Sequence, residues 1–175
     1  MTGKLLVIIL VFCAALAAGG MYYLQIYGFY YDVEPSAGRD VVLVTADGEV
    51  PEPIAYSNFR AIDADSSPIR YRACFETDLT PDALARDHVP VDEAMPLQTP
   101  GWFDCFDAEA LGEKLASGEA RAFLSQKNIH YGVDRVVAVT QDGRGYAWHI
   151  LNDCGEKAYD GTVVGEECPP RPGTE

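Results

Sequence analysis

The chain has 175 residues, and its 27 acidic against 13 basic residues give a formal net charge of −14 at pH 7. A field of this sign repels phosphate, which argues against nucleic acid and anionic membrane surfaces as partners. The acidic residues are dispersed along the chain, a pattern typical of a surface charged for solubility, although a basic partner or a cation also fits it.

Residues 5–31 carry no charged side chain and predict a transmembrane helix. Residues 5–24 alone have the length of about 20 apolar residues that a helix needs to cross roughly 30 Å of bilayer hydrocarbon. A helix also satisfies its own backbone polar groups, which lipid requires. The aromatic side chains toward the end of the stretch predict an interfacial belt: Tyr22, Tyr23, Tyr27, Phe29, Tyr30 and Tyr31.

The charges that flank this helix predict its orientation. Residues 1–4 include Lys4, whereas the other side opens with Asp32 and Glu34, so the positive-inside rule makes residues 1–4 a cytoplasmic tail. A cleaved signal peptide is the competing interpretation, with residues 5–14 as its apolar core and residues 15–17 as a small-x-small cleavage site. The apolar sequence continues for about two helical turns beyond residue 17, which favours an uncleaved anchor.

Four cysteines follow the helix: Cys74, Cys105, Cys154 and Cys168. An even number of cysteines in an exported domain predicts two disulfides, and four cysteines allow three pairings. The local pairing, Cys74–Cys105 with Cys154–Cys168, is the preferred one. The chain has no CxxC motif and no histidine at ligand spacing from a cysteine, so we expect neither a metal site nor a cofactor.

The first half of the exported part mixes strand and turn signals. Residues 32–40 have the composition of a linker, and residues 41–45 read as a strand that ends in a turn at Asp47-Gly48. Residues 54–62 are a short strand or an irregular passage. Residues 69–76 alternate apolar with polar side chains, which predicts a half-buried strand.

Helix signals follow. Thr80 before Pro81 predicts the cap of a short helix over residues 81–86, and residues 88–101, with their prolines, predict an ordered loop. Asp107 predicts the cap of a second helix, which Gly118 interrupts and which residues 119–127 then resume.

A hairpin closes the domain. Residues 133–141 and 145–151 flank Asp142-Gly143, a strong turn signal. From residue 152 onward we expect a loop clamped by the last two cysteines, and residues 169–175 are expected to be a disordered tail. The sequence therefore predicts an N-terminal transmembrane helix followed by one small α+β domain over residues 41–168, with a mainly antiparallel sheet.

Motifs with chemical meaning are sparse. Asp63, Asp65 and Ser67 match the first ligand positions of a calcium-binding loop, but Pro68 and Cys74 replace its obligatory glycine and glutamate, so a turn is favoured over a cation site. His149 lies inside the second hairpin strand, where a histidine is more often a satisfied core residue than a catalytic base. We found no nucleophile elbow, phosphate loop or dinucleotide fingerprint, and we expect no catalytic residues.

Two aromatic groups stand out, Trp102 with Phe103 and Tyr146 with Trp148. Each fits either core packing around a disulfide or an exposed interaction surface. Core packing is favoured, because exposed apolar patches are uncommon. An interaction surface made of these four residues is the alternative.

The layout resembles an uncharacterised bacterial family of short, single-pass membrane-anchored proteins, classed as a domain of unknown function and sometimes labelled histidine kinases. The resemblance lies in the charge-free helix, in DADSSP at residues 63–68 leading to RYRACF at residues 70–75, and in WFDCFD at residues 102–107. It implies the bacterial cytoplasmic (inner) membrane, with the C-terminal domain in the periplasm. It implies no activity, and the kinase label has no support, because the cytoplasmic side holds only residues 1–4.

The leading functional hypothesis is a membrane-tethered accessory or interaction module without catalytic activity, whose partner is a membrane or envelope protein. The alternative is a periplasmic sensor module that binds a cation through Asp63 and Asp65, or a small ligand through Arg70 and Arg72. An enzyme is the third hypothesis, and it requires a cleft that joins His149 to a carboxylate.

Overall fold

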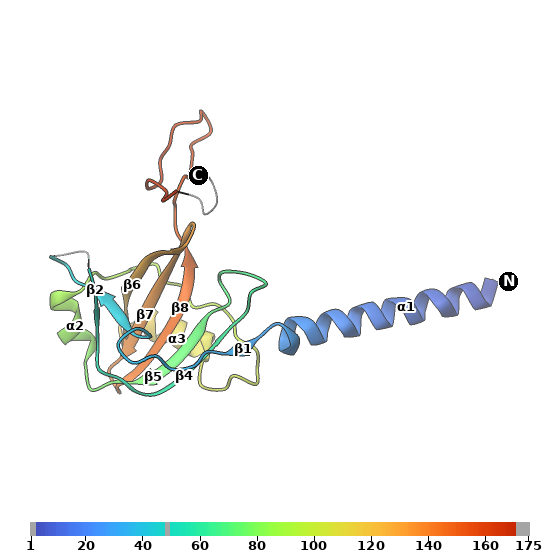
Figure 1. Cartoon of the computed structure of the whole chain (residues 1–175), viewed down its shortest axis with the longest axis horizontal. Coiled ribbons are helices and arrows are strands. Elements are labelled where there is room, and N and C mark those ends of the chain that lie inside the picture. Colours follow the sequence, from blue (N-terminus) through green and yellow to red (C-terminus); the bar gives the residue numbers. More distant parts are fainter. Residues whose placement is uncertain (1–2, 48–49, 171–175) are drawn as a thin grey trace.

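A long helix stands out from the rest of the molecule at its N-terminal end (Figure 1). The computed structural model describes residues 3–47 and 50–170. Helix α1 (Gly3–Tyr23) continues directly into a π-helical turn, Leu24–Gly28. None of its residues is buried, and Gly3–Gly28 is long and apolar enough to cross a membrane. A membrane anchor and a signal sequence both meet that criterion of length and composition.

The domain is built on one antiparallel sheet of six strands in the order β1-β4-β5-β8-β7-β6. A second sheet has two strands, and two helices lie outside the sheets. This arrangement confirms the predicted α+β fold. In chain order the elements are β1 (Tyr31–Asp32), β2 (Val42–Val44), β3 (Pro51–Pro53), β4 (Ser57–Asp63), β5 (Arg72–Glu76), α2 (Pro81–Asp87), α3 (Ala108–Ser117), β6 (Ala120–His130), β7 (Val133–Thr140) and β8 (Arg144–Leu151).

Both helices of the domain begin where the sequence predicts. The Thr80 hydroxyl accepts a hydrogen bond from the amide of Ala83 at the start of α2, with Pro81 in the first turn. The Asp107 carboxylate accepts two amide hydrogen bonds at the start of α3. Gly118, at φ +81°, ends α3 in the left-handed region that favours glycine.

The predicted continuation of the second helix over residues 119–127 is wrong, because β6 occupies Ala120–His130. The apolar residues there fit both the period of a helix and that of a strand, but pairing with β7 satisfies the backbone hydrogen-bonding groups from Ala120 to Leu124. The strand also places Phe123 in the core on one side and Ala122 in the core on the other. Tertiary pairing therefore overrides local helix propensity.

Two hydrophobic cores cover the two faces of the sheet. One includes Phe103, Phe106 and Trp148 together with residues of α3, and the other includes residues of β2 and α2. The alternation predicted for residues 69–76 is real, since Phe75 enters one core and Cys74 the other. The expectation of a half-buried strand is wrong, because β5 lies at the centre of the sheet and both of its faces are covered.

Local pairing of the cysteines is confirmed by the two disulfides, Cys74–Cys105 and Cys154–Cys168. The predicted hairpin is also confirmed, with Gly143 at φ +79° in the turn between β7 and β8. Gly48 of the other predicted turn and residues 171–175 of the predicted tail lie outside the described residues.

The segment predicted as a linker, residues 32–40, is fixed to the domain at both ends. Asp32 belongs to β1 and pairs with Ile62 of β4. At the other end Asp40 is buried, and its carboxylate accepts a hydrogen bond of 2.7 Å from the Tyr56 hydroxyl. The helix is therefore followed almost immediately by the sheet, with little free chain between them.

Arg72, at the start of β5, ties two loops together from inside the domain. Its guanidinium donates to the backbone carbonyls of Leu97 and Gln98 in one loop and to those of Ile69 and Tyr71 in the other, at 2.6–3.2 Å. Burial lowers the pKa of Arg72 to about 10, so that the group is still charged at neutral pH. A single buried cation thus connects the loop that precedes β5 to the loop that contains Leu97 and Gln98.

Replacing this cation tests its structural role. We expect Arg72→Met to lower the free energy of unfolding by about 3 kcal/mol, because it preserves volume but leaves buried carbonyls without donors. The matched control is Arg144→Met, whose exposed ion pair with Asp142 predicts a loss below about 1 kcal/mol. The measurement is denaturant unfolding of the full-length protein in detergent, and equal losses in the two variants would contradict the assignment.

Candidate functional site

Three of the four aromatic residues proposed for an interaction surface lie in the core. Phe103 is 3% exposed, Tyr146 9% and Trp148 0%. The favoured interpretation, core packing, is therefore confirmed for these three residues, and the alternative of an exposed interaction surface is wrong for them. Phe106 packs edge-to-face against both Tyr146 and Trp148. Aromatic residues beside a disulfide predict either a core or an interface, and here two-sided burial of the sheet decides for the core.

Trp102 is the exception, and it lies where the domain meets the end of the long helix. Its side chain is 38% exposed. The indole Nε1 donates to the carbonyl of Ile26 in the π-helical turn at 2.7 Å. The last carbonyls of a helix have no partner within the helix, so the domain supplies one of the missing donors.

Arg70 makes the second contact at this place. One of its nitrogens donates to the Gln25 side chain at 2.7 Å and another to the Tyr30 hydroxyl at 3.1 Å. The Tyr30 ring in turn packs edge-to-face against Trp102. A cation near a helix C-terminus is also favoured by the helix dipole. We call these five residues the helix–domain joint: Gln25, Ile26, Tyr30, Arg70 and Trp102.

The joint was not predicted from the sequence. Trp102 and Ile26 are separated by 76 residues, and Arg70 and Gln25 by 45, so no local pattern connects them. The only signals in the sequence were a polar residue, Gln25, near the end of an apolar helix and an arginine, Arg70, at the edge of a strand pattern. Arg70, proposed as half of a ligand-binding pair with Arg72, instead contacts the helix, while Arg72 binds backbone carbonyls.

The two aspartates considered for a cation site contact the protein itself. Asp63 accepts a hydrogen bond from the Ala64 amide, and Asp65 accepts one from the Tyr31 hydroxyl at 3.3 Å. Burial raises the pKa of Asp63 above its usual value. Within residues 3–47 and 50–170, no group of three or more His, Cys, Asp or Glu side chains is placed to hold a metal.

His149 is fully buried and both of its ring nitrogens have partners. Nδ1 lies 2.6 Å from the Pro68 carbonyl, and Nε2 lies 3.0 Å from Nε of Arg135. Because that arginine nitrogen donates, the neutral tautomer with its proton on Nδ1 satisfies both contacts. Tyr71 stacks on the ring, with centroids 4.9 Å apart. Burial lowers the pKa of His149 to about 4.

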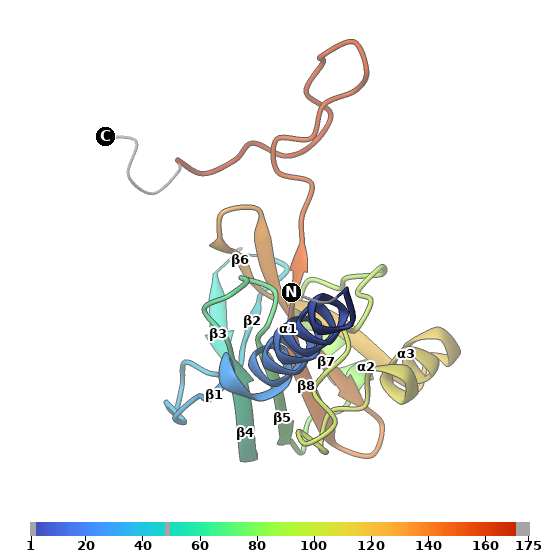
Figure 2. The ribbon, with the colours of Figure 1, turned by 90° about the vertical axis from the view of Figure 1, so that its right-hand side faces the viewer.

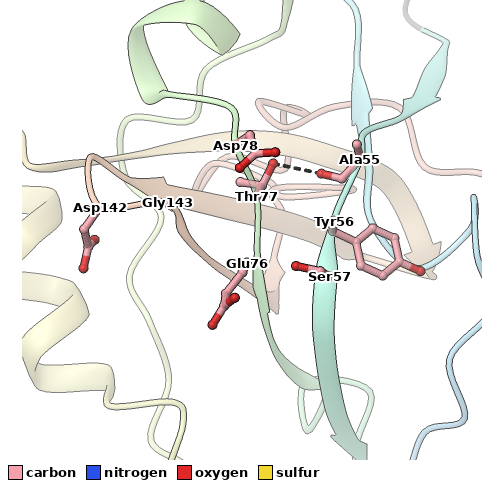
Figure 3. Close-up of a pocket in the computed structure, with 8 residues that line it drawn as sticks. All are labelled: Ala55, Tyr56, Ser57, Glu76, Thr77, Asp78, Asp142 and Gly143. Carbon is pink, nitrogen blue, oxygen red and sulfur yellow. Dashed lines mark hydrogen bonds between the residues drawn. The ribbon is translucent and has the colours of Figure 1, made fainter.

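A cavity of about 320 Å³ opens between the start of β4, the end of β5 and the turn that joins β7 to β8 (Figure 3). Three of its lining residues are acidic: Glu76, Asp78 and Asp142. Glu76 accepts a hydrogen bond from Asn58, and Asp142 accepts one from Thr140, which lowers the pKa of Asp142. Figure 3 shows the Tyr56 ring turned away from these carboxylates.

Gly143 allows the hairpin turn beside this cavity to approach the end of β5 closely. Its carbonyl accepts the Thr77 amide at 2.8 Å, and a Cβ on Gly143 would lie 2.8 Å from the Thr77 carbonyl oxygen. The hairpin turn is therefore pressed against the end of β5. The Glu76 carboxylate contacts the neighbouring strand and that of Asp142 contacts the turn, and Figure 3 shows that the three carboxylates do not face one common point.

Beyond β8 the chain forms a projection that we call the C-terminal arm, residues 152–170. Figures 1 and 2 show it standing away from the sheet. At its base, Asn152 donates to the side chains of Asn128 and Asp134, and the Cys154–Cys168 disulfide closes the loop. Its far end exposes three apolar side chains: Tyr159, Val163 and Val164.

Comparison with known proteins adds a family. A model described as a family of unknown function, DUF6446, matches residues 41–169. The match begins just before β2 and includes nearly all of the C-terminal arm, and it leaves α1 and β1 outside. No curated protein matches the chain, and no solved structure matches it.

The buried histidine predicts a pH dependence of stability. Its pKa falls from 6.5 to about 4 on folding, so between these values the unfolded chain binds a proton that the folded chain does not. The contribution of His149 to the free energy of unfolding is fully present above pH 6.5. It is lost as the pH falls toward 4, and the loss is at most about 3 kcal/mol.

Unfolding free energies of the full-length protein, measured between pH 4 and 7.5, should show this loss in the wild type but a shallower slope in His149→Gln. His88→Gln is the control, because His88 lies at the end of α2 away from these groups. Identical slopes in the wild type and His149→Gln would refute the assignment.

The joint predicts a local change in hydrogen exchange. Trp102→Phe keeps the ring against Tyr30 but removes the donor to Ile26, at a cost of about 1 kcal/mol. Amides of the π-helical turn should then exchange about five times faster, while those of β7 and β8 keep their rates. Tyr22→Phe, on the exposed side of α1, is the control, and unchanged exchange in Trp102→Phe would exclude a role for this contact.

Proposed function

The chain belongs to DUF6446, a family of unknown function, and from its geometry we propose that it is a membrane-tethered accessory module that acts through protein contacts outside the cytoplasm. In this proposal α1 is an uncleaved anchor in the bacterial cytoplasmic membrane, and the domain lies in the periplasm. The chain has a structural and binding role and carries out no reaction of its own.

The helix–domain joint is the observation that supports this proposal most. A domain on a free tether needs no contact with its helix. Here Trp102 and Arg70 both donate to the last turn of the helix, at 2.7 Å in each case. Such contacts fix the orientation of the domain relative to the helix, which serves a protein that must present one surface to a neighbour in the same membrane.

Two further features agree with this placement. Both disulfides are of the kind that forms and persists in oxidising compartments such as the bacterial periplasm. Lys4, in the first turn of α1, lies at the opposite end of the helix from the acidic domain, as the positive-inside rule requires. Trp102 and Tyr30 then occupy the interface, where aromatic side chains with a polar end are favoured.

The anchor is tested by intact mass. Full-length protein with a C-terminal tag, solubilised from membranes in mild detergent, should keep its N-terminal residues and elute with a stoichiometric membrane partner. The variant Ala15→Leu/Ala17→Leu, which removes the small-x-small signal, should differ from the wild type only by the mass of the substitutions.

Cleavage predicts a different pair of masses. A wild-type chain shortened near residue 17, lengthened in the double variant and eluting as a lone monomer would contradict the proposal. Protease added to spheroplasts should digest the domain, whereas protease added to intact cells should not, and digestion restricted to broken cells would place the domain on the wrong side.

A further inference from the structure

The C-terminal arm is ordered although it packs on little else. Ala158 and Thr162 face each other across its tip, joined by an amide-to-carbonyl hydrogen bond of 2.8 Å, and the Val164 amide donates to the Glu156 carbonyl at 2.9 Å. Lys157 and Val163 form an isolated bridge between the two sides. The arm is therefore a short hairpin that holds its shape through its own backbone.

Two glycines and one disulfide make that shape possible. A Cβ on Gly165 would lie 1.7 Å from the Asp153 carbonyl oxygen, and one on Gly155 would lie 2.9 Å from the sulfur of Cys168. Gly155 also has φ +71°, a conformation that favours glycine. The ion pair between Lys127 and Glu166 joins the base of the arm to β6. These devices order a segment that buries no core of its own.

An exposed arm that is already held in one conformation is suited to binding a partner. A loop that is already held in one conformation loses less entropy when a partner docks on it. The tip offers a fully exposed tyrosine, Tyr159, beside two valines that are each more than half exposed, Val163 and Val164. Tyrosine is among the residues that most often dominate the binding energy of an interface.

The charge of the arm selects the kind of partner. Along its length the arm carries five acidic residues and one basic residue, of which Glu166 pairs with Lys127 at the base. The six are Asp153, Glu156, Asp160, Glu166, Glu167 and Lys157. A second copy of the chain, with net charge −14, is repelled, and so is a surface of anionic lipid. A surface with an excess of Lys and Arg around an apolar recess is complementary.

The direction of the arm further limits the kinds of protein that can bind it. Figure 1 shows the arm extending across the axis of α1 rather than along it, and Figure 2, from the end of α1, shows it reaching out to one side. If α1 crosses the membrane, the arm runs beside the bilayer surface, at the level of neighbouring membrane proteins.

We propose that the C-terminal arm is the docking element of this protein, with Tyr159 as its anchor, and that its partner is a basic extracytoplasmic surface of another integral membrane protein. This inference rests on the proposed function and names the surface through which it is carried out. Binding is strengthened by low salt, because acidic side chains of the arm face basic ones on the partner.

The test is site-specific photo-cross-linking in cells that make the protein natively. The full chain carries p-benzoylphenylalanine in place of Tyr159, or, as the control position, in place of Glu109 on α3. We expect one heterologous adduct from position 159 and none from position 109. The cross-linked peptide of the partner should be extracytoplasmic and rich in Lys and Arg.

Charge reversal provides the matched variants. Glu156→Lys/Glu167→Lys in the arm should lower the adduct yield about tenfold, while Glu109→Lys/Glu113→Lys on α3, with the same change in net charge, should leave it unchanged. Intact mass under non-reducing conditions confirms that Cys154 and Cys168 remain paired in each variant.

Three results would overturn the inference: no adduct from position 159, an adduct with a second copy or with lipid, or an adduct whose partner peptide is not basic. Failure of the arm is distinguishable from failure of the proposed function. If a complex with a membrane partner is isolated in detergent and the arm variants do not disrupt it, the proposed function is retained and the arm is not the docking element. If the chain elutes as a lone monomer, both are refuted.

Discussion

The contact between the Trp102 indole and the Ile26 carbonyl is the constraint on which the arrangement of the molecule depends. Without it, the domain and the helix are connected through the short passage into β1 and the hydrogen bonds of Arg70. With it, and with the pair of hydrogen bonds from Arg70, the end of the helix becomes part of the packing of the domain. Every surface of the domain then has a defined direction relative to the helix, including the C-terminal arm, which follows the C-terminal end of β8.

Interactions inside the domain hold the residues of this joint in place. Arg70 lies two residues before β5 and Arg72 is its first residue. The two have different environments, since Arg70 reaches the helix and Arg72 binds four backbone carbonyls inside the domain. The loop fixed by Arg72 lies close in sequence to Trp102. The disulfide Cys74–Cys105 holds the segment on the other side of that tryptophan. The position of one indole is thus determined by a buried cation and a covalent link, both of which tolerate little change.

What could be predicted from the sequence is what local chemistry decides. The caps at Thr80 and Asp107, the turn at Gly143, the apolar helix and the nearest-neighbour disulfides all follow from short patterns. Strand β6 was predicted as a helix because its pairing with β7, not its own composition, decides its form. The joint was out of reach for a related reason, since it depends on residues tens of positions away in the chain.

A rigid orientation of the domain relative to α1 is the central claim, and an electron–electron distance distribution measures it most directly. Spin labels on non-natural residues in place of Leu6 in α1 and Ser117 at the end of α3, in full-length protein in lipid nanodiscs, report how the two parts sit together. A single narrow distribution that broadens when Trp102 and Arg70 are both replaced by alanine is the predicted result. A broad distribution in the wild type, unchanged by those substitutions, would show that the domain swings freely on its helix and would contradict the claim.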